Sequence, residues 1–145
     1  MATFKRFEDI EAWKLAREIC KDVHEITSSG MLAKDFELKG QMRGSSGSMM
    51  DNIAEGFERD GAREFIQFLS IAKGSSGELK SQLYRALDSK YIEQNKFSTI
   101  FSMADNYGRM VGKLINYLNA SDIRGAKFKN KIMLTGNPKQ ETSNS

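Results

Sequence analysis

The single proline, at position 138, is the feature that most limits what this chain can fold into. A proline ring blocks a backbone donor and clashes with the preceding helical turn, so the 137 residues before it are free to be helical. Apolar residues recur at steps of three and four through most of that stretch, whereas no segment shows the alternation of a strand. The pattern predicts an all-α protein.

Four helices are predicted, over residues 8–27, residues 35–58, a stretch that ends at residue 90, and residues 94–119. Ser28-Ser29-Gly30 ends the first helix, and Gly30 is the expected left-handed residue there. Asp60-Gly61 forms the turn before the third helix, with Asp60 as the candidate N-cap. Helices of this length joined by short turns predict an antiparallel up-down-up-down four-helix bundle.

Each predicted helix has an apolar seam that we expect to be buried. In chain order the seams are Trp13, Ala16, Cys20, Val23 and Thr27; Met42, Ser46, Met49, Ile53 and Phe57; Phe65, Leu69, Ala72, Ser76, Leu79, Leu83 and Ala86; and Phe97, Ile100, Ala104, Tyr107, Val111, Leu114 and Leu118.

The second and third helices also carry a row of small residues. The two rows are Gly40, Gly44, Gly47, Asp51 and Ala54, and Ser70, Gly74, Gly77 and Ser81. Each glycine costs a helix about 1 kcal/mol relative to alanine, so a close approach of another backbone is expected to offset it. That backbone belongs either to the same bundle or to a second subunit. The alternative is a helix broken around Gly44 and Gly47.

The chain divides into a bundle domain, residues 1–120, and a basic tail, residues 121–145, that lacks helical period. Residues 1–120 contain 17 Lys and Arg against 17 Asp and Glu, so the whole excess of +3 lies in the tail. Cys20 is the only cysteine, and the chain shows neither a signal-peptide core nor a membrane-length apolar run. We therefore expect a cytoplasmic protein with no membrane partner.

Few residues are suited to catalysis. His24, the only histidine, lies four residues after Cys20, a spacing that can begin a zinc site, but no second Cys/His pair completes it. The Glu-x-x-His pairs of di-iron bundles and a Gly-Lys-Ser/Thr phosphate loop are both absent. We expect no catalytic residues, no metal and no cofactor, hence no enzyme.

Polar residues on the second and third helices form two candidate groups. The first is a structural hydrogen-bond network of Asn52, Glu55, Glu64, Ser75 and Glu78, which would fix the register of the two helices; the alternative is a ligand-binding groove. The second is a set of basic residues that includes Lys39, Arg43, Arg59, Arg63, Lys73 and Lys80. These are candidate phosphate contacts, with a solvated surface as the alternative.

Two motifs carry a family resemblance. Asn52-Ile53-Ala54-Glu55-Gly56 and Ile71-Ala72-Lys73-Gly74-Ser75, the latter followed by Glu78-Leu79, resemble the bacterial four helix bundle protein family encoded by intervening sequences of 23S rRNA genes. The accessory variability proteins of diversity-generating retroelements are relatives of that family. One departure is Arg43-Gly44-Ser45-Ser46, where the family often has Arg-Arg-Ala-Ala. The other departure is in the turn after the first helix, where this chain has Ser29-Gly30-Met31 in place of the Phe-Pro that is usual in the family.

The resemblance implies a ring-like homopentamer, a family for which no enzymatic activity is established, and relatives that bind nucleic acid and a reverse transcriptase. By analogy, Arg43, Arg59, Arg63 and Lys73 are the expected nucleic-acid contacts. The leading hypothesis is a homo-oligomer that binds RNA or DNA through basic faces of the ring. The alternative is an oligomeric scaffold that recognises a protein, such as a nucleic-acid polymerase, through the fourth helix or the tail.

Overall fold

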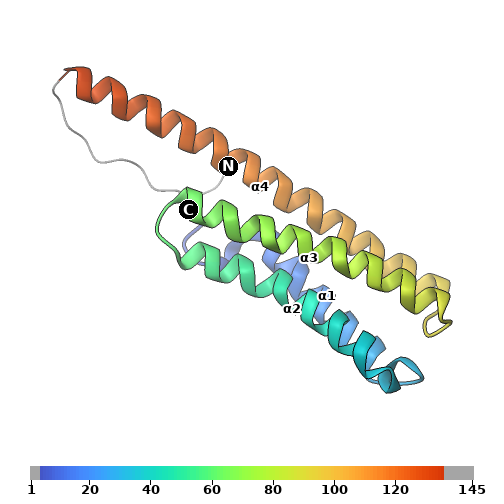
Figure 1. Cartoon of the computed structure of the whole chain (residues 1–145). Coiled ribbons are helices and arrows are strands. Elements are labelled where there is room, and N and C mark those ends of the chain that lie inside the picture. The colour runs from blue at the N-terminus through green and yellow to red at the C-terminus, as the bar shows by residue number, and fades with distance from the viewer. Residues whose placement is uncertain (1–3, 136–145) are drawn as a thin grey trace.

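The computed structural model describes residues 4–135, with side chains described from Phe4 to Ser121. Four long helices form an antiparallel bundle, and no strand occurs in this part of the chain (Figure 1). The helices are α1 (Glu11–Thr27), α2 (Phe36–Glu58), α3 (Ala62–Asp88) and α4 (Gln94–Thr135), with the short 3-10 helices η1 (Phe7–Asp9) and η2 (Leu32–Lys34) before α1 and α2. The predicted all-α four-helix bundle is confirmed.

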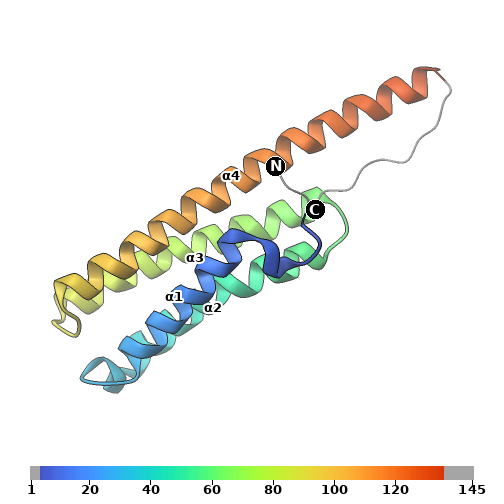
Figure 2. The ribbon, with the colours of Figure 1, turned by 180° about the vertical axis from the view of Figure 1, so that it is seen from behind.

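Each helix packs against its neighbours in the chain, and α1 also packs against α4 to close the bundle. As a result, α2 and α4 lie at diagonally opposite corners, while α3 lies between them (Figures 1 and 2). Helix α3 therefore has two different seams, one with α2 and one with α4. This arrangement positions all of the polar clusters described below.

The predicted apolar seams form the core. Their members on α3 and α4 are all buried, and Tyr107 and Phe65 are among the largest fully buried side chains. Trp13, Cys20 and Phe57 are only partly buried. On α1 the buried face is shifted from the predicted seam, because Ala12, Ile19 and Ile26 are buried beside Ala16, Val23 and Thr27. The two serines in the seams are tolerated because their hydroxyls donate to carbonyls of the preceding turn, Ser46 to Met42 at 3.0 Å and Ser76 to Lys73 at 2.6 Å.

The helix ends agree with the sequence at two positions and differ at a third. Asp35 caps α2 by accepting a hydrogen bond from the Leu38 amide at 3.1 Å. Gly30 has the expected left-handed backbone, with φ 65°. The prediction of Asp60 as the N-cap of α3 was wrong, because Gly61 occupies that position with φ 94° and makes no side-chain cap. A φ in this range favours glycine, so the backbone geometry of the turn explains why Gly61 occupies the N-cap position.

Helix α4 is longer than predicted. The apolar period ends near Asn119, but the backbone remains helical to Thr135 and projects beyond the other three helices (Figures 1 and 2). A helix does not need an apolar stripe to continue where no proline interrupts it. The first part of the predicted basic tail is thus a continuation of α4, and residues 136–145 lie outside the described part of the chain.

The small-residue rows do not pack within the bundle. A Cβ atom added at Gly40, Gly44 or Gly47 would have no neighbour within 4 Å, and the same holds for Gly74 and Gly77. The close approach occurs instead at Gly56, a glycine outside both rows. There an added Cβ would lie 2.7 Å from Phe68 Cβ and 3.0 Å from Phe65 Cδ1. The helix is unbroken at Gly44 and Gly47, which excludes the broken-helix alternative.

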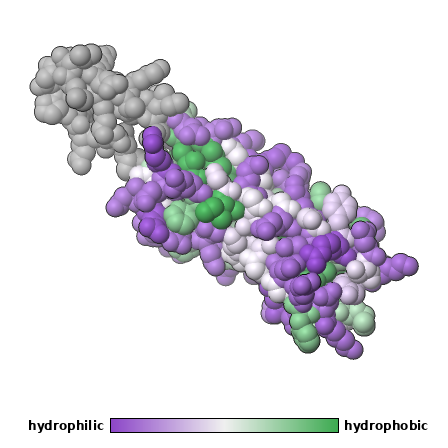
Figure 3. Space-filling view, viewed as in Figure 1, coloured by the Kyte–Doolittle hydropathy of each residue, from purple (hydrophilic) through white to green (hydrophobic). Residues whose placement is uncertain are grey.

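The described surface exposes few large hydrophobic side chains. Its exposed large hydrophobic residues are Met31, Phe36, Ile71 and Tyr84. The face in Figure 3 is correspondingly hydrophilic over most of its extent, with hydrophobic atoms confined to small patches. Charge, rather than an extended apolar patch, therefore distinguishes one region of the described surface from another.

Candidate functional site

A groove of about 430 Å³ runs between α3 and α4. Its walls carry basic side chains from both helices, and its floor consists of small residues. The lining residues are Lys73, Ser76, Gly77 and Lys80 from α3, with Asp105, Gly108, Arg109, Gly112, Lys113 and Asn116 from α4.

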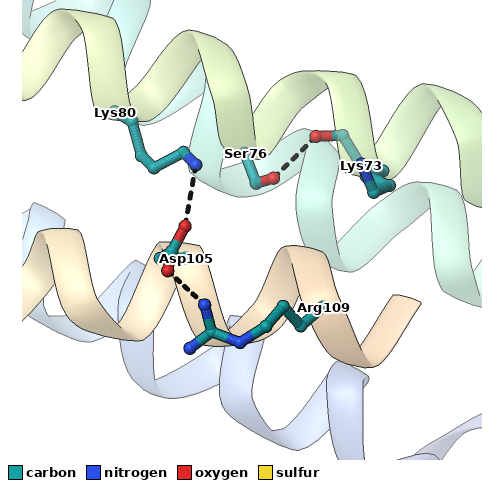
Figure 4. A network of polar contacts seen from close by, with 5 residues as sticks. All are labelled: Lys73, Ser76, Lys80, Asp105 and Arg109. Carbon is teal, nitrogen blue, oxygen red and sulfur yellow. Dashed lines mark hydrogen bonds and ion pairs between the residues drawn. The ribbon is translucent and has the colours of Figure 1, made fainter. Parts of the chain in front are cut away.

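The groove is open because its floor has almost no side-chain bulk. A Cβ added at Gly108 would lie 3.5 Å from Ser76 Oγ, and one at Gly112 would lie 3.6 Å from Lys73 Cε, so both helices stay in contact at ordinary distances. The Ser76 hydroxyl donates a hydrogen bond to the backbone carbonyl of Lys73 on its own helix, as Figure 4 shows. Ser76 therefore does not pair with the cationic side chains that line the groove.

Asp105 organises two of the four cations. Its Oδ1 accepts a hydrogen bond from Lys80 Nζ at 3.1 Å, and its Oδ2 accepts one from Arg109 Nη1 (Figure 4). The hydrogen bond from Lys80, followed by that from Arg109, lowers the pKa of the Asp105 carboxyl below its ordinary value, so the group is ionised at neutral pH. Four cations against one carboxylate give the groove a formal charge of +3.

Of the four predicted nucleic-acid contacts, only Lys73 lies in this groove. Arg43 is on the opposite side of the bundle, where its Nε donates to Thr27 Oγ1 at 2.8 Å and its Nη2 donates to Ser28 Oγ at 2.9 Å. Thr27 and Ser28 form the C-terminal end of α1, which a cation stabilises through the helix dipole. The structure gives Arg43 a bonding role between α1 and α2.

Arg59 and Arg63 flank the turn between α2 and α3, away from Lys73. Arg59 Nη2 donates to Glu55 Oε2 at 2.8 Å, and its guanidinium lies 5.1 Å from the ring centroid of Phe68. The bond to Glu55 raises the pKa of Arg59 further above its ordinary value. Arg63 is exposed in the first turn of α3. The four predicted residues therefore occupy three separate places on one chain.

The predicted polar network forms in part. Ser48 and Ser75 share a hydrogen bond of 2.7 Å across the α2/α3 seam, and Asn52 Nδ2 donates to Ser48 Oγ at 2.7 Å and to Ser48 O at 3.0 Å. Asn52 and Ser75 are thus joined through Ser48. Among the described residues, no hydrogen bond connects Glu55, Glu64 or Glu78 to this cluster: Glu55 pairs with Arg59, and Glu78 is exposed.

Arg109 and Lys113 were missed as site residues. The sequence contains a signal for them, because Gly108-Arg109 and Gly112-Lys113 repeat a glycine and a cation at a spacing of four. Residues four apart share one face of a helix, so the repeat places two cations beside two gaps. Which neighbouring helix faces that side is not encoded in the repeat, and the pairing with Lys73 and Lys80 follows from the fold.

Cys20 and His24 do not form a metal-ligand set. The Cys20 thiol donates to the Ser46 carbonyl at 3.1 Å, and burial raises its pKa, which keeps the sulfur protonated. His24 is exposed. Within the described residues, no three His, Cys, Asp or Glu side chains cluster closely enough to hold a metal ion. The helices there also include none that is both long enough and apolar enough to cross a membrane.

The fold is similar to that of a solved structure. A crystal structure of a protein of unknown function from the S23 ribosomal protein family of Bacteroides thetaiotaomicron superimposes with a TM-score of 0.66 at 19% sequence identity, covering 72% of this chain and 97% of that one. No curated protein matches the chain. Residues 8–113 match the 23S rRNA-intervening sequence protein family, and this range includes the two motifs that begin at Asn52 and Ile71. The chain therefore belongs to the 23S rRNA-intervening sequence protein family.

Proposed function

We propose that this protein is a non-enzymatic homo-oligomer that binds RNA or DNA in the groove between α3 and α4. The observation that carries the proposal is the segregation of charge. Residues 1–120 contain 17 Lys and Arg against 17 Asp and Glu. The groove holds four of these cations and one of these carboxylates, so the rest of this segment has 13 cations against 16 carboxylates. A formally neutral body thus concentrates its positive charge in one groove, where a phosphate backbone is attracted most strongly.

Self-association is supported by the outer surface of α2. Gly40, Gly44 and Gly47 lie on the side of α2 opposite the buried Met42 and Met49, and their backbone is open. Three glycines in one helix weaken it unless another backbone packs there. Since no part of the described chain does so, a second copy is the partner we propose. Helix α4 is diagonal to α2, so this contact leaves the groove accessible.

The nucleic-acid proposal is tested by removing charge from the groove. Lys73→Gln with Lys113→Gln removes two cations without orphaning Asp105, whose partners are Lys80 and Arg109. We expect weaker binding of RNA or DNA, with the slope of log affinity against log salt reduced by about two. Fluorescence anisotropy from about 50 to 200 mM salt measures both quantities.

The matched control removes the same charge from α1. Lys14→Gln with Lys21→Gln changes two exposed lysines that pair only with neighbours on their own helix, Glu11 and Glu18. Equal losses in the two double variants would mean that net charge, not the groove, determines binding. Absence of binding by the wild-type oligomer at about 50 mM salt would refute the proposal.

The oligomer is tested by light scattering coupled to size exclusion. A pentamer has five times the mass of the 16.4 kDa chain. Gly44→Leu is expected to lower that mass while the helical circular dichroism is retained, because a Cβ atom at Gly44 has no neighbour within 4 Å in its own bundle. A monomeric wild-type protein, or a Gly44→Leu variant of unchanged mass, would contradict the proposed contact.

A further inference from the structure

Three aromatic rings cluster beside the groove, where α3 and α4 approach the turn that joins them. The ring centroid of Tyr84 lies 4.9 Å from that of Phe97 and 5.6 Å from that of Phe101, and the two phenylalanine rings are 5.2 Å apart. Phe97 is buried and Phe101 is partly buried, whereas Tyr84 remains 51% exposed. Tyr84 is therefore a ring supported by two others, with half of its surface in water.

The aromatic cluster is continuous with the basic groove through Lys80. Lys80 lines the groove, and its Nζ lies 5.5 Å from the ring centroid of Phe101. Tyr84 follows Lys80 by four residues on α3, which places it on the same side of the helix and about 6 Å further along. A row of cations thus leads directly to an exposed aromatic ring.

A cation row that ends at an exposed ring is the combination with which proteins bind single strands, in which the bases are free to stack on side chains. The bases of a duplex already stack on each other, and a duplex presents mainly its phosphates. The groove also lies between two helices in direct contact, whose axes are about 8–10 Å apart, so a single strand can enter it more deeply than a duplex can. A purely structural role, in which the side chain at position 84 covers Phe97 and Phe101, explains the buried half of the Tyr84 ring. It does not explain why the other half is exposed.

We propose that the α3/α4 groove binds single-stranded nucleic acid, with a base stacked on Tyr84 and phosphates held by Lys73, Lys80, Arg109 and Lys113. This inference rests on the proposed function and narrows its ligand to one class. The backbone enters along the glycine floor, and Tyr84 receives the base at the end of the groove. Because every base has a π-face, binding is expected to tolerate different sequences.

The experiment compares three probes of equal length in fluorescence anisotropy: oligothymidylate, the same backbone without bases, and a duplex. The wild-type protein should bind oligothymidylate most tightly. Tyr84→Leu keeps an apolar cover over Phe97 and Phe101 but removes the π-face, so it should weaken oligothymidylate binding by roughly fivefold to thirtyfold and leave the abasic probe unchanged. Tyr84→Phe should bind like the wild type.

The matched control is Phe36→Leu, which removes an aromatic ring that is 79% exposed on α2 and does not line the groove. It should leave all three affinities unchanged. Equal affinity of the wild type for the three probes, or no effect of Tyr84→Leu, would overturn the single-strand inference while the charge-based proposal stands. A lower oligomer mass for Tyr84→Leu would also overturn it, because Tyr84 would then be a subunit contact. Failure of all three probes to bind would refute the proposed function itself.

Discussion

Helix α3 packs against α2 through one seam and faces α4 across another, and both seams contain small residues. In the α2/α3 seam, Gly56 brings the backbones together and the hydroxyls of Ser48 and Ser75 bond to each other at 2.7 Å. In the α3/α4 seam, Gly108 and Gly112 leave a groove with charged walls. Small residues therefore have opposite effects in the two seams: Phe65 and Phe68 fill the space beside Gly56, whereas charged side chains border an open groove beside Gly108 and Gly112.

The largest expected effect is at the closest point of the α2/α3 seam. Gly56→Ala places a Cβ 2.7 Å from Phe68 Cβ, an atom that cannot move without its backbone, so the free energy of unfolding should fall by about 1–3 kcal/mol. Gly74→Ala is the control, because its Cβ meets nothing within 4 Å; replacing this helical glycine should raise stability by up to about 1 kcal/mol. Urea unfolding of both variants tests whether the two substitutions change the free energy of unfolding in opposite directions.

A smaller loss is expected from the hydroxyl pair of the same seam. Ser75→Ala leaves Ser48 without its partner across the seam, and should cost about 1 kcal/mol of unfolding free energy. Ser70→Ala on the exposed side of α3 is the control, since the Ser70 hydroxyl bonds only within its own helix. Equal effects of the two substitutions would show that the bond between Ser48 and Ser75 contributes nothing specific to the α2/α3 seam.

Substitutions in the α3/α4 seam should change ligand affinity more than stability. Asp105→Asn removes the only carboxylate of the groove and raises its formal charge from +3 to +4, which releases Lys80 and Arg109 for phosphate. Affinity for oligothymidylate at low salt should increase by about fivefold, which corresponds to the interaction of about 1 kcal/mol between two unit charges roughly 4 Å apart in water. Anisotropy at two salt concentrations tests this; unchanged or weaker binding would indicate that Asp105 positions the two cations for the ligand.

The sequence predicts the core well because burial follows the helical period. Met42, Met49 and Ile53 recur at helical spacing, and all three are fully buried. The same period, followed further around α2, places Gly40, Gly44 and Gly47 opposite those residues and thus on the outside. Of the two alternatives for this row, a contact within the same bundle could therefore have been set aside from the sequence, whereas a contact between subunits stays a prediction.

The site was predicted less completely, because a helix pattern does not specify which neighbour each side faces. Lys73 and Lys80 were both recognised as candidate phosphate contacts, but their groove partners Arg109 and Lys113 lie on a helix that the polar motifs do not mark. Arg43 illustrates the reverse case. Its bonds to Thr27 and Ser28 depend on how close the end of α1 comes to α2, which is a property of the tertiary structure.

The smallest effect expected in the α3/α4 seam is a pH-dependent one on stability. Because Lys80 and Arg109 lower the pKa of Asp105 in the folded chain, the ionised carboxylate favours folding above its unfolded pKa of about 3.9, and this contribution is lost as the pH falls through the lower folded pKa. The melting temperature of the wild type should therefore exceed that of Asp105→Asn slightly at neutral pH, and the difference should shrink below about pH 4. In a Lys80→Gln background, which lacks the main cause of the shift, the difference should be smaller at every pH. A difference that stayed constant down to about pH 2 would assign it to packing rather than to the ion pair.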